Sequence, residues 1–159
     1  MNITEHLAEL KKQKELFESF YNNELPTIVG VEAVNFFTES FENEGFTDEV
    51  LEPWQEVKRR QDPKRPDRAA ASRKILTGDT ADLGRSIEYT PEAGQVKITS
   101  DTVNAGSDKD YAAAHNEGTT TAGRNRNVTI PKRQFIGKSK KLDEIIDEKV
   151  VKRIKKILK

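Results

Sequence analysis

Cysteine is absent from this 159-residue chain, and histidine occurs only twice. Without cysteine there is no disulfide framework, no cysteine-bound zinc and no thiol nucleophile, and the composition fits a protein made in a reducing cytoplasm. A lone histidine cannot close a typical zinc site. The sequence also lacks a glycine-rich phosphate loop with Lys-Ser/Thr, an HExxH and a GxSxG motif. We therefore expect no catalytic residues, no metal and no cofactor.

Long apolar runs are also missing. No stretch approaches the 18 uninterrupted apolar residues of a membrane-spanning helix, and the first six residues do not resemble a secretory signal. About a third of the residues, 34%, are hydrophobic and another 34% are charged. This length and composition predict a single domain over residues 1–159 with a thin core.

The net charge is zero, but the charges are unevenly distributed along the chain. Residues 1–56 hold 3 Lys/Arg against 13 Asp/Glu, whereas residues 132–159 hold 11 against 4. One interpretation is a pair of solvated helix faces of opposite sign. The other is that the acidic end of one copy binds the basic end of the next, since complementary potentials fix register.

Apolar residues spaced by three and four predict helices over residues 4–22, 27–44 and 140–158. Thr4 is the expected N-cap of the first helix, and Pro26 is expected to end or restart it. Gly45 is expected to end the second helix, because glycine adopts a positive φ without steric cost.

Alternating residues predict strands in the second half of the chain, at 83–90, 95–99 and 127–131, with a four-residue hairpin loop at 91–94. Residues 46–68 have an irregular pattern in which Trp54 is expected to hold the loop onto the helices. Residues 69–86 show a short helical pattern with a turn at 77–79, and Asp79 or Thr80 is a candidate cap for the turn that follows. The fold class is thus α+β: N-terminal helices, a small antiparallel β-sheet and a C-terminal amphipathic helix.

Two polar stretches, residues 100–110 and 116–127, are predicted as loops. The second is long, and a long loop in a small domain is either functional or mobile. Because predicted strands flank it, we take it as the candidate partner-binding loop. Its candidate residues are Asn116, Glu117, Gly118, Thr119, Thr120, Arg124 and Arg126.

His115 and Glu117 form a His-x-Glu pair of the kind found in zinc deaminases, but those enzymes also need Pro-Cys-x-x-Cys. A small hydrolase built around these two residues remains one alternative. The other interpretation of His115 is structural, with its ring nitrogens bonding a helical turn or the next loop.

The basic C-terminal helix suggests a second alternative, a nucleic-acid-binding module held by phosphate neutralisation. Against it, the helix has no interleaved aromatic residues and the chain has no overall basic excess. The apolar face of this helix carries no Trp or Phe, which also disfavours a membrane surface.

The order of motifs in the second half carries a family resemblance. The motifs are Leu76-Thr77-Gly78, Leu83-x-x-Ser86-Ile87, Tyr111-Ala-Ala-Ala-His115-Asn-Glu-Gly118 and Ile130-Pro131-Lys-Arg133-Gln-Phe135-Ile136-Gly137. Together they resemble the phage virion morphogenesis family, the tail completion and head–tail joining proteins of tailed phages and prophages. The matching positions are Gly78, Tyr111, His115, Gly118, Pro131, Arg133, Phe135 and Gly137.

The resemblance implies a structural, non-catalytic subunit that forms a ring and completes the tail or joins it to the head. It implies a virion component assembled in the bacterial host cytoplasm, with other tail or neck proteins and further copies of itself as partners. Neither a membrane nor, as main partner, nucleic acid is expected. Residues 26–159 would be the family core and residues 1–25 an extension. Arg133 would form a fork-like ion pair, and Phe135 and Ile136 would dock under the C-terminal helix.

Overall fold

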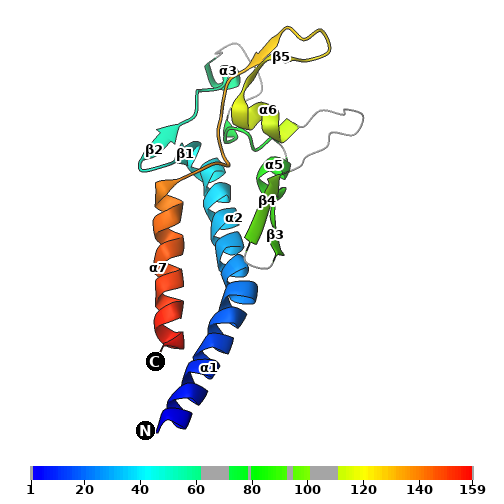
Figure 1. The fold of residues 1–159 in the computed structure, drawn as a ribbon. Helices are drawn as coiled ribbons and strands as arrows, with labels where there is room; N and C mark the ends of the chain where they lie inside the picture. The colour runs from blue at the N-terminus through cyan, green and yellow to red at the C-terminus, as the bar shows by residue number, and fades with distance from the viewer. Residues whose placement is uncertain (1, 62–71, 79, 93–94, 101–110, 159) are drawn as a thin grey trace.

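The computed structural model describes residues 2–61, 72–78, 80–92, 95–100 and 111–158. A long helical rod runs through α1 (Ile3–Ser19), the π-helical turn η1 (Phe20–Glu24) and α2 (Leu25–Asn43), and α7 (Lys140–Ile157) lies beside α2 (Figure 1). Three antiparallel two-stranded sheets and three short helices are the other elements of the described residues. The predicted α+β class is confirmed, but the strands form three separate hairpins instead of one small sheet.

The first helix begins earlier than the sequence pattern indicated. Asn2 is the N-cap: its side-chain Oδ1 accepts from the Glu5 N–H at 2.8 Å, and the Glu5 carboxylate accepts from the Asn2 N–H at 2.9 Å. This reciprocal capping box satisfies two backbone donors that the helix itself leaves unpaired. The prediction of Thr4 as the cap was therefore wrong, and Thr4 lies inside the first turn.

Pro26 does not interrupt the rod. Proline has no N–H, and in a regular α-helix its ring clashes with the carbonyl four residues earlier. Here the helix widens into η1 just before it, where the Leu25 N–H bonds to the Phe20 carbonyl five residues back. A local π-turn of this kind absorbs such a conflict without a break. The predicted end or restart at Pro26 is thus a change of helix type within a continuous rod.

The second helix ends on Glu44, not on Gly45. Glu44 adopts a positive φ of 51°, and its carboxylate accepts from the Ile75 N–H at 2.6 Å and from the Arg60 guanidinium. Gly45 is needed for a different reason, since a Cβ there would lie 2.6 Å from the Glu52 carbonyl oxygen. The bonds of the Glu44 carboxylate to Ile75 and Arg60 hold the Glu44 backbone at a positive φ, which non-glycine residues seldom adopt.

Part of the stretch predicted as irregular is ordered. β1 (Gly45–Thr47) pairs with β2 (Leu51–Pro53), with Phe46 opposite Glu52, and α3 (Lys58–Gln61) follows. Residues 62–71 lie outside the described residues. The prediction for Trp54 is confirmed: it is buried, its ring meets Phe41 edge-on at 5.5 Å, and its Nε1 donates to the Gln134 carbonyl at 2.7 Å.

The second hairpin pairs β3 (Ile87–Glu92) with β4 (Gln95–Ser100), and the register continues to Glu92 opposite Gln95. The predicted four-residue loop at 91–94 was therefore too long, because Pro91 still pairs with Val96. The first strand was also predicted to start too early, since Leu83 belongs to the short helix α5 (Asp82–Arg85).

The turns before this hairpin differ in part from the prediction. Gly78 adopts a positive φ of 56°, which suits the predicted turn. The N-cap of α5 is Ala81, with a φ of 57°, so the cap predicted at Thr80 was wrong. Asp79, like the predicted loop residues 101–110, lies outside the described residues.

The core lies where α2 meets the first two hairpins, the segment after β6 and the start of α7. Phe41 of α2 lies at its centre, 5.1 Å from the ring of Phe135. Phe135 is 1% exposed and belongs, with Leu142 of α7, to the buried core cluster, and Ile136 packs against that cluster. Gly30 of α2 leaves room for the Tyr89 ring of β3, since a Cβ there would overlap that ring.

Opposite charges of the two ends of the chain meet within one molecule. The Arg153 guanidinium of α7 donates two hydrogen bonds to the Glu24 carboxylate, at 2.5 and 2.7 Å, and thereby lowers the pKa of Glu24. Lys149 pairs with Glu32, and Lys140 with Glu49. Exposed pairs of this kind contribute about 0–1 kcal/mol each. Two of these pairs join α7 to η1 and α2 of the rod, so neither face is merely solvated.

Candidate partner-binding site

The stretch predicted as a long loop, residues 116–127, is mostly a third hairpin. β5 (Thr119–Ala122) pairs with β6 (Val128–Ile130), with Thr119 opposite Ile130, Ala122 opposite Val128 and a register shift between them. The turn between the strands uses positive φ angles at Gly123 and Arg126. The loop prediction was therefore wrong, whereas β6 confirms the predicted third strand.

This hairpin is fixed at its base to α6 (Tyr111–Glu117). Gly118 connects α6 to β5 with a φ of 75°, and a Cβ there would lie 2.8 Å from the backbone nitrogen of Lys132. The Arg133 N–H donates to the His115 carbonyl at 2.8 Å. Only glycine fits at position 118, because both its positive φ and the close approach of the Lys132 backbone exclude a side chain.

Asn116 ties the base of the hairpin to the core. Its side-chain Oδ1 accepts from the backbone N–H groups of Phe135 and Ile136, at 2.9 and 3.0 Å. Its amide nitrogen donates to the exposed Glu117 carboxylate at 2.6 Å. Asn116 is thus a structural residue of the candidate site, and its acceptor oxygen is not directed at a partner.

Arg133 is buried, with 7% of its surface exposed. Its Nε and Nη2 both donate to the Gln55 carbonyl oxygen, at 3.2 and 3.0 Å. Burial, followed by the charge of Arg59, lowers the pKa of Arg133. Among the described residues no carboxylate forms an ion pair with it, so the fork exists but its predicted ionic partner is replaced by a backbone carbonyl.

His115 packs its ring edge-on against Tyr111, with the ring centres 4.4 Å apart. Its Nδ1 is buried and has no hydrogen-bond partner among the described residues, so the expected bond from that nitrogen is not formed. Burial and, after it, the Arg133 charge lower the pKa of His115 to about 4. The ring is therefore neutral at pH 7 and serves as a packing surface.

His115 and Glu117 do not converge on one point. Residues two apart on a helix point about 200° apart around its axis, and the Glu117 carboxylate is exposed and bonded to Asn116. No group of three His, Asp or Glu that could hold a metal ion is found among the described residues. This arrangement gives the hydrolase alternative no support.

Three of the four exposed residues of the candidate site lie on the hairpin, and the fourth, Glu117, is the last residue of α6. Glu117, Thr120, Arg124 and Arg126 are exposed, whereas Asn116, Gly118 and Thr119 are partly buried near its base. The hairpin projects at the end of the molecule opposite the two chain termini (Figure 1). The structure thus divides the predicted residues into a supporting group and an exposed basic tip.

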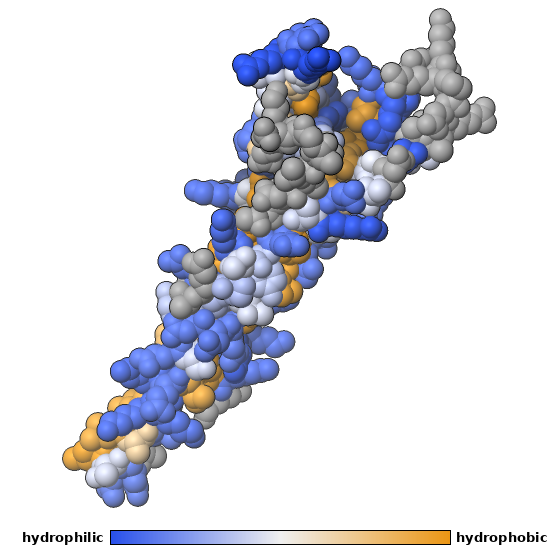
Figure 2. All heavy atoms as spheres, turned by 90° about the vertical axis from the view of Figure 1, so that its right-hand side faces the viewer, coloured by the Kyte–Doolittle hydropathy of each residue, from blue (hydrophilic) through white to orange (hydrophobic). Residues whose placement is uncertain are grey.

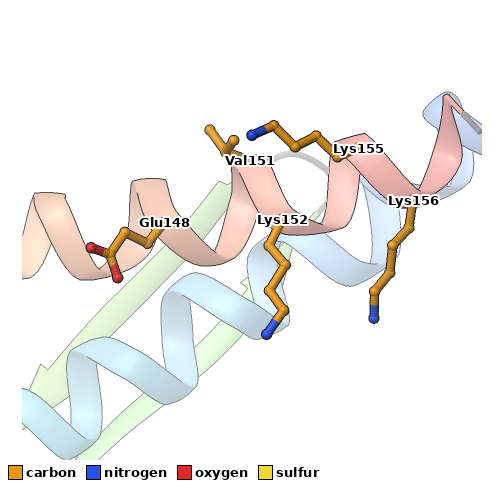
Figure 3. Close-up of a pocket in the computed structure, with 5 residues that line it drawn as sticks. All are labelled: Glu148, Val151, Lys152, Lys155 and Lys156. Carbon is orange, nitrogen blue, oxygen red and sulfur yellow. The ribbon is translucent and has the colours of Figure 1, made fainter.

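A groove of about 470 Å³ lies on α7, lined by Glu148, Val151, Lys152, Lys155 and Lys156. Lys152 and Lys156 point to one side of the helix, Val151 and Lys155 to the other (Figure 3). A small-molecule site needs polar groups that converge in a concave apolar pocket, whereas these side chains come from one helix and diverge. Among the described helices, none has the length and apolarity to cross a bilayer.

The model of the phage virion morphogenesis family matches residues 41–155. The chain belongs to this family. The match begins at Phe41, so α1, η1 and most of α2 precede it, while all three hairpins, α6 and nearly all of α7 lie within it. No curated protein and no solved structure matches the chain.

Membership makes this a protein of phage virion morphogenesis, a structural family, and confirms the resemblance carried by the second-half motifs. Several of those motif positions have structural roles: Gly118 allows a close approach, and Phe135 fills the core. Sequence reasoning missed β5 and the role of Asn116. The Thr-Thr-Thr-Ala segment lacks the alternating apolar residues that predict a strand. The hydrogen bonds from the Asn116 side chain to distant backbone groups leave no local signal in the sequence.

Proposed function

We propose that this protein is a non-catalytic structural subunit that completes the tail, or joins it to the head, of a tailed phage or prophage particle, and that it works in a closed ring. The observation that supports this is the family match over residues 41–155. Subunits with head-to-tail contacts close into a ring when their rotation permits. The partners are other tail or neck proteins and further copies of the chain. The protein is then part of the virion and assembles in the host cytoplasm.

The β5–β6 hairpin is our candidate for the contact with a tail or neck protein. Its base is held by Gly118 and by the two bonds that Asn116 accepts. A rigid support lowers the entropy lost on binding. Its tip presents Arg124 and Arg126, and a two-stranded hairpin also has open strand edges to which another strand can add.

The nucleic-acid alternative is weakened by the contacts of α7. Arg153 and Lys149 pair with acidic residues of the rod within the same chain. Lys152, Lys155 and Lys156 have no ion pair among the described residues and are exposed. A gel shift that is strong at low salt and falls steeply with salt would favour DNA binding over the structural role.

Deleting the gene from the phage or prophage tests the structural role. We expect particles with incomplete or unjoined tails by electron microscopy, rescue by the wild-type gene, and the protein present in purified virions as a ring at the tail end. Normal particles from the deletion strain, or virions that lack the protein, would refute the proposal.

The hairpin is tested by the charge-reversal variant Arg124→Glu/Arg126→Glu in the same rescue assay. The matched control is Lys58→Glu/Lys97→Glu, which changes the same charge at exposed positions of α3 and β4. We expect the hairpin variant to fold but fail to restore joined tails, while the control restores them. Equal rescue by both variants would rule out the tip as the contact.

A further inference from the structure

An exposed apolar stripe runs along α1 into η1. Its members are Ile3, Leu7, Leu10, Phe17 and Tyr21, which are between 45% and 81% exposed. No residue of α1 itself is buried. Figure 2 shows hydrophobic atoms at the surface of the lower end of the molecule, the end that Figure 1 shows to be formed by α1. Large apolar side chains gathered on one exposed face indicate an interaction surface.

The family domain leaves most of this stripe uncovered. The ion pair of Arg153 with Glu24 places the last turns of α7 beside η1, and α7 ends at Ile157. The first turns of α1 extend past that end (Figure 1). The stripe also precedes the matched residues 41–155. The matched part of the chain reaches α1 through α7 but leaves the side chains of the stripe largely exposed.

The spacing of the stripe identifies the kind of partner. With Lys14 included, the positions 3, 7, 10, 14, 17 and 21 follow one another by four, three, four, three and four residues. This spacing matches the heptad repeat of a coiled coil, in which a second helix with the same repeat covers the seam. A second copy of this chain provides such a helix. The four glutamates and three lysines of α1 leave it nearly neutral, so two copies do not repel strongly.

Lys14 selects the orientation of the two helices. In a parallel, in-register pair, Lys14 would face its own copy inside the seam, and like charges there are unfavourable. The spacing reads the same in both directions, so an antiparallel pair centred on Lys12 brings apolar residues together. It places Ile3 opposite Tyr21 and Leu7 opposite Phe17.

The same arrangement places Lys14 opposite Leu10. The methylene stem of Lys14 can then cover Leu10 while its ammonium group stays with Glu18, 3.5 Å away in the free chain. We propose that α1 pairs with α1 of a second copy as an antiparallel two-helix coiled coil. The pairing is a two-fold contact in addition to any ring, and it does not depend on the role in the tail.

The full-length protein in dilute buffer tests the pairing by sedimentation equilibrium. We expect a reversible dimer. The dissociation constant of the dimer should be at least about a hundredfold higher for Leu7→Glu/Leu10→Glu, since each change buries a charge in the seam. The matched control is Ala8→Glu/Ser19→Glu, which adds the same charge at exposed positions off the stripe. A wild-type monomer at about 100 μM, a concentration that still populates weak dimers, or a control as weakened as the seam variant, would overturn the proposal.

The absence of cysteine makes the orientation measurable. An antiparallel pair places Leu7 near Phe17 of the second copy, so mixing Leu7→Cys with Phe17→Cys should give a disulfide-linked dimer under mild oxidation. Leu7→Cys alone should remain unlinked. Efficient linking of Leu7→Cys to itself would mean a parallel pair and would overturn the antiparallel arrangement. Tail rescue by Leu7→Glu/Leu10→Glu is scored in a separate assay. A failure of the pairing tests therefore leaves the proposed role in the tail unaffected.

Discussion

The side chain of Asn116 offers the sharpest test of how the candidate site is built. Its Oδ1 accepts from the N–H groups of Phe135 and Ile136, and both bonds are partly buried. Replacing Asn116 by alanine leaves both donors without this acceptor. Leaving one buried donor unsatisfied costs about 1–3 kcal/mol. Because both groups lose the same acceptor and water can reach part of the gap, we expect Asn116→Ala to lower the free energy of unfolding by about 2–4 kcal/mol.

Urea unfolding followed by the fluorescence of Trp54 is the assay, since the Trp54 indole bonds to Gln134 next to this segment. The control Glu117→Ala removes only the exposed contact to the Asn116 amide, and should cost less than about 0.5 kcal/mol. Asn116→Asp keeps the acceptor oxygen and should recover more than half of the loss. If Asn116→Ala costs no more than Glu117→Ala, the base of the hairpin is not held in this way.

Further predictions concern the backbone and the ionisable groups. Gly118→Ala should lose about 2–3 kcal/mol of unfolding free energy more than Gly78→Ala, since both have a positive φ but only Gly118 approaches another backbone; equal losses would contradict this. Unlike a His115→Gln variant, the wild type should lose stability as the pH falls from about 6.5 towards 4. The pKa of His115 is lowered to about 4 in the fold, so protonation favours the unfolded chain. The largest possible loss of unfolding free energy is about 3 kcal/mol, and solvent screening reduces the expected loss to about 1–2 kcal/mol. The pKa of Glu44 is lowered mainly by Arg60, so its contribution, about 1 kcal/mol, is present above about pH 4.5 and lost below it; a Glu44→Gln variant should show a flatter acid limb in urea titrations.

The helices were the part of the fold most open to prediction from sequence. Apolar spacing placed the second and last helices within two residues of α2 and α7, because those stripes pack in the core. The ends were less certain, since they depend on single side chains. Asn2 caps the first helix because Glu5 lies three residues later, and Glu44 ends the second because Ile75 and Arg60 hold it.

The candidate site was only partly predictable, because its geometry depends on long-range bonds. The Arg133 guanidinium binds the carbonyl oxygen of Gln55, 78 residues away in the sequence, and any residue can supply a carbonyl. The arginine made two parallel donor contacts foreseeable, but not the acceptor that receives them. β5 was missed because its threonines give no apolar alternation, and its pairing with β6 depends on where Gly118 turns the chain.

This division of the site determines which variants can identify a binding surface. A change at Asn116 or Gly118 removes the support of the hairpin, so loss of tail joining in such a variant would report misfolding as readily as lost contact. The exposed side chains of Arg124 and Arg126 have no hydrogen bond or ion pair among the described residues, and substituting them should leave the unfolding free energy within about 0.5 kcal/mol. Loss of tail joining with unchanged stability at these two positions would therefore be evidence for a contact. Loss of tail joining in a variant of Asn116 or Gly118 would not be evidence for a contact unless the unfolding free energy of that variant were also measured.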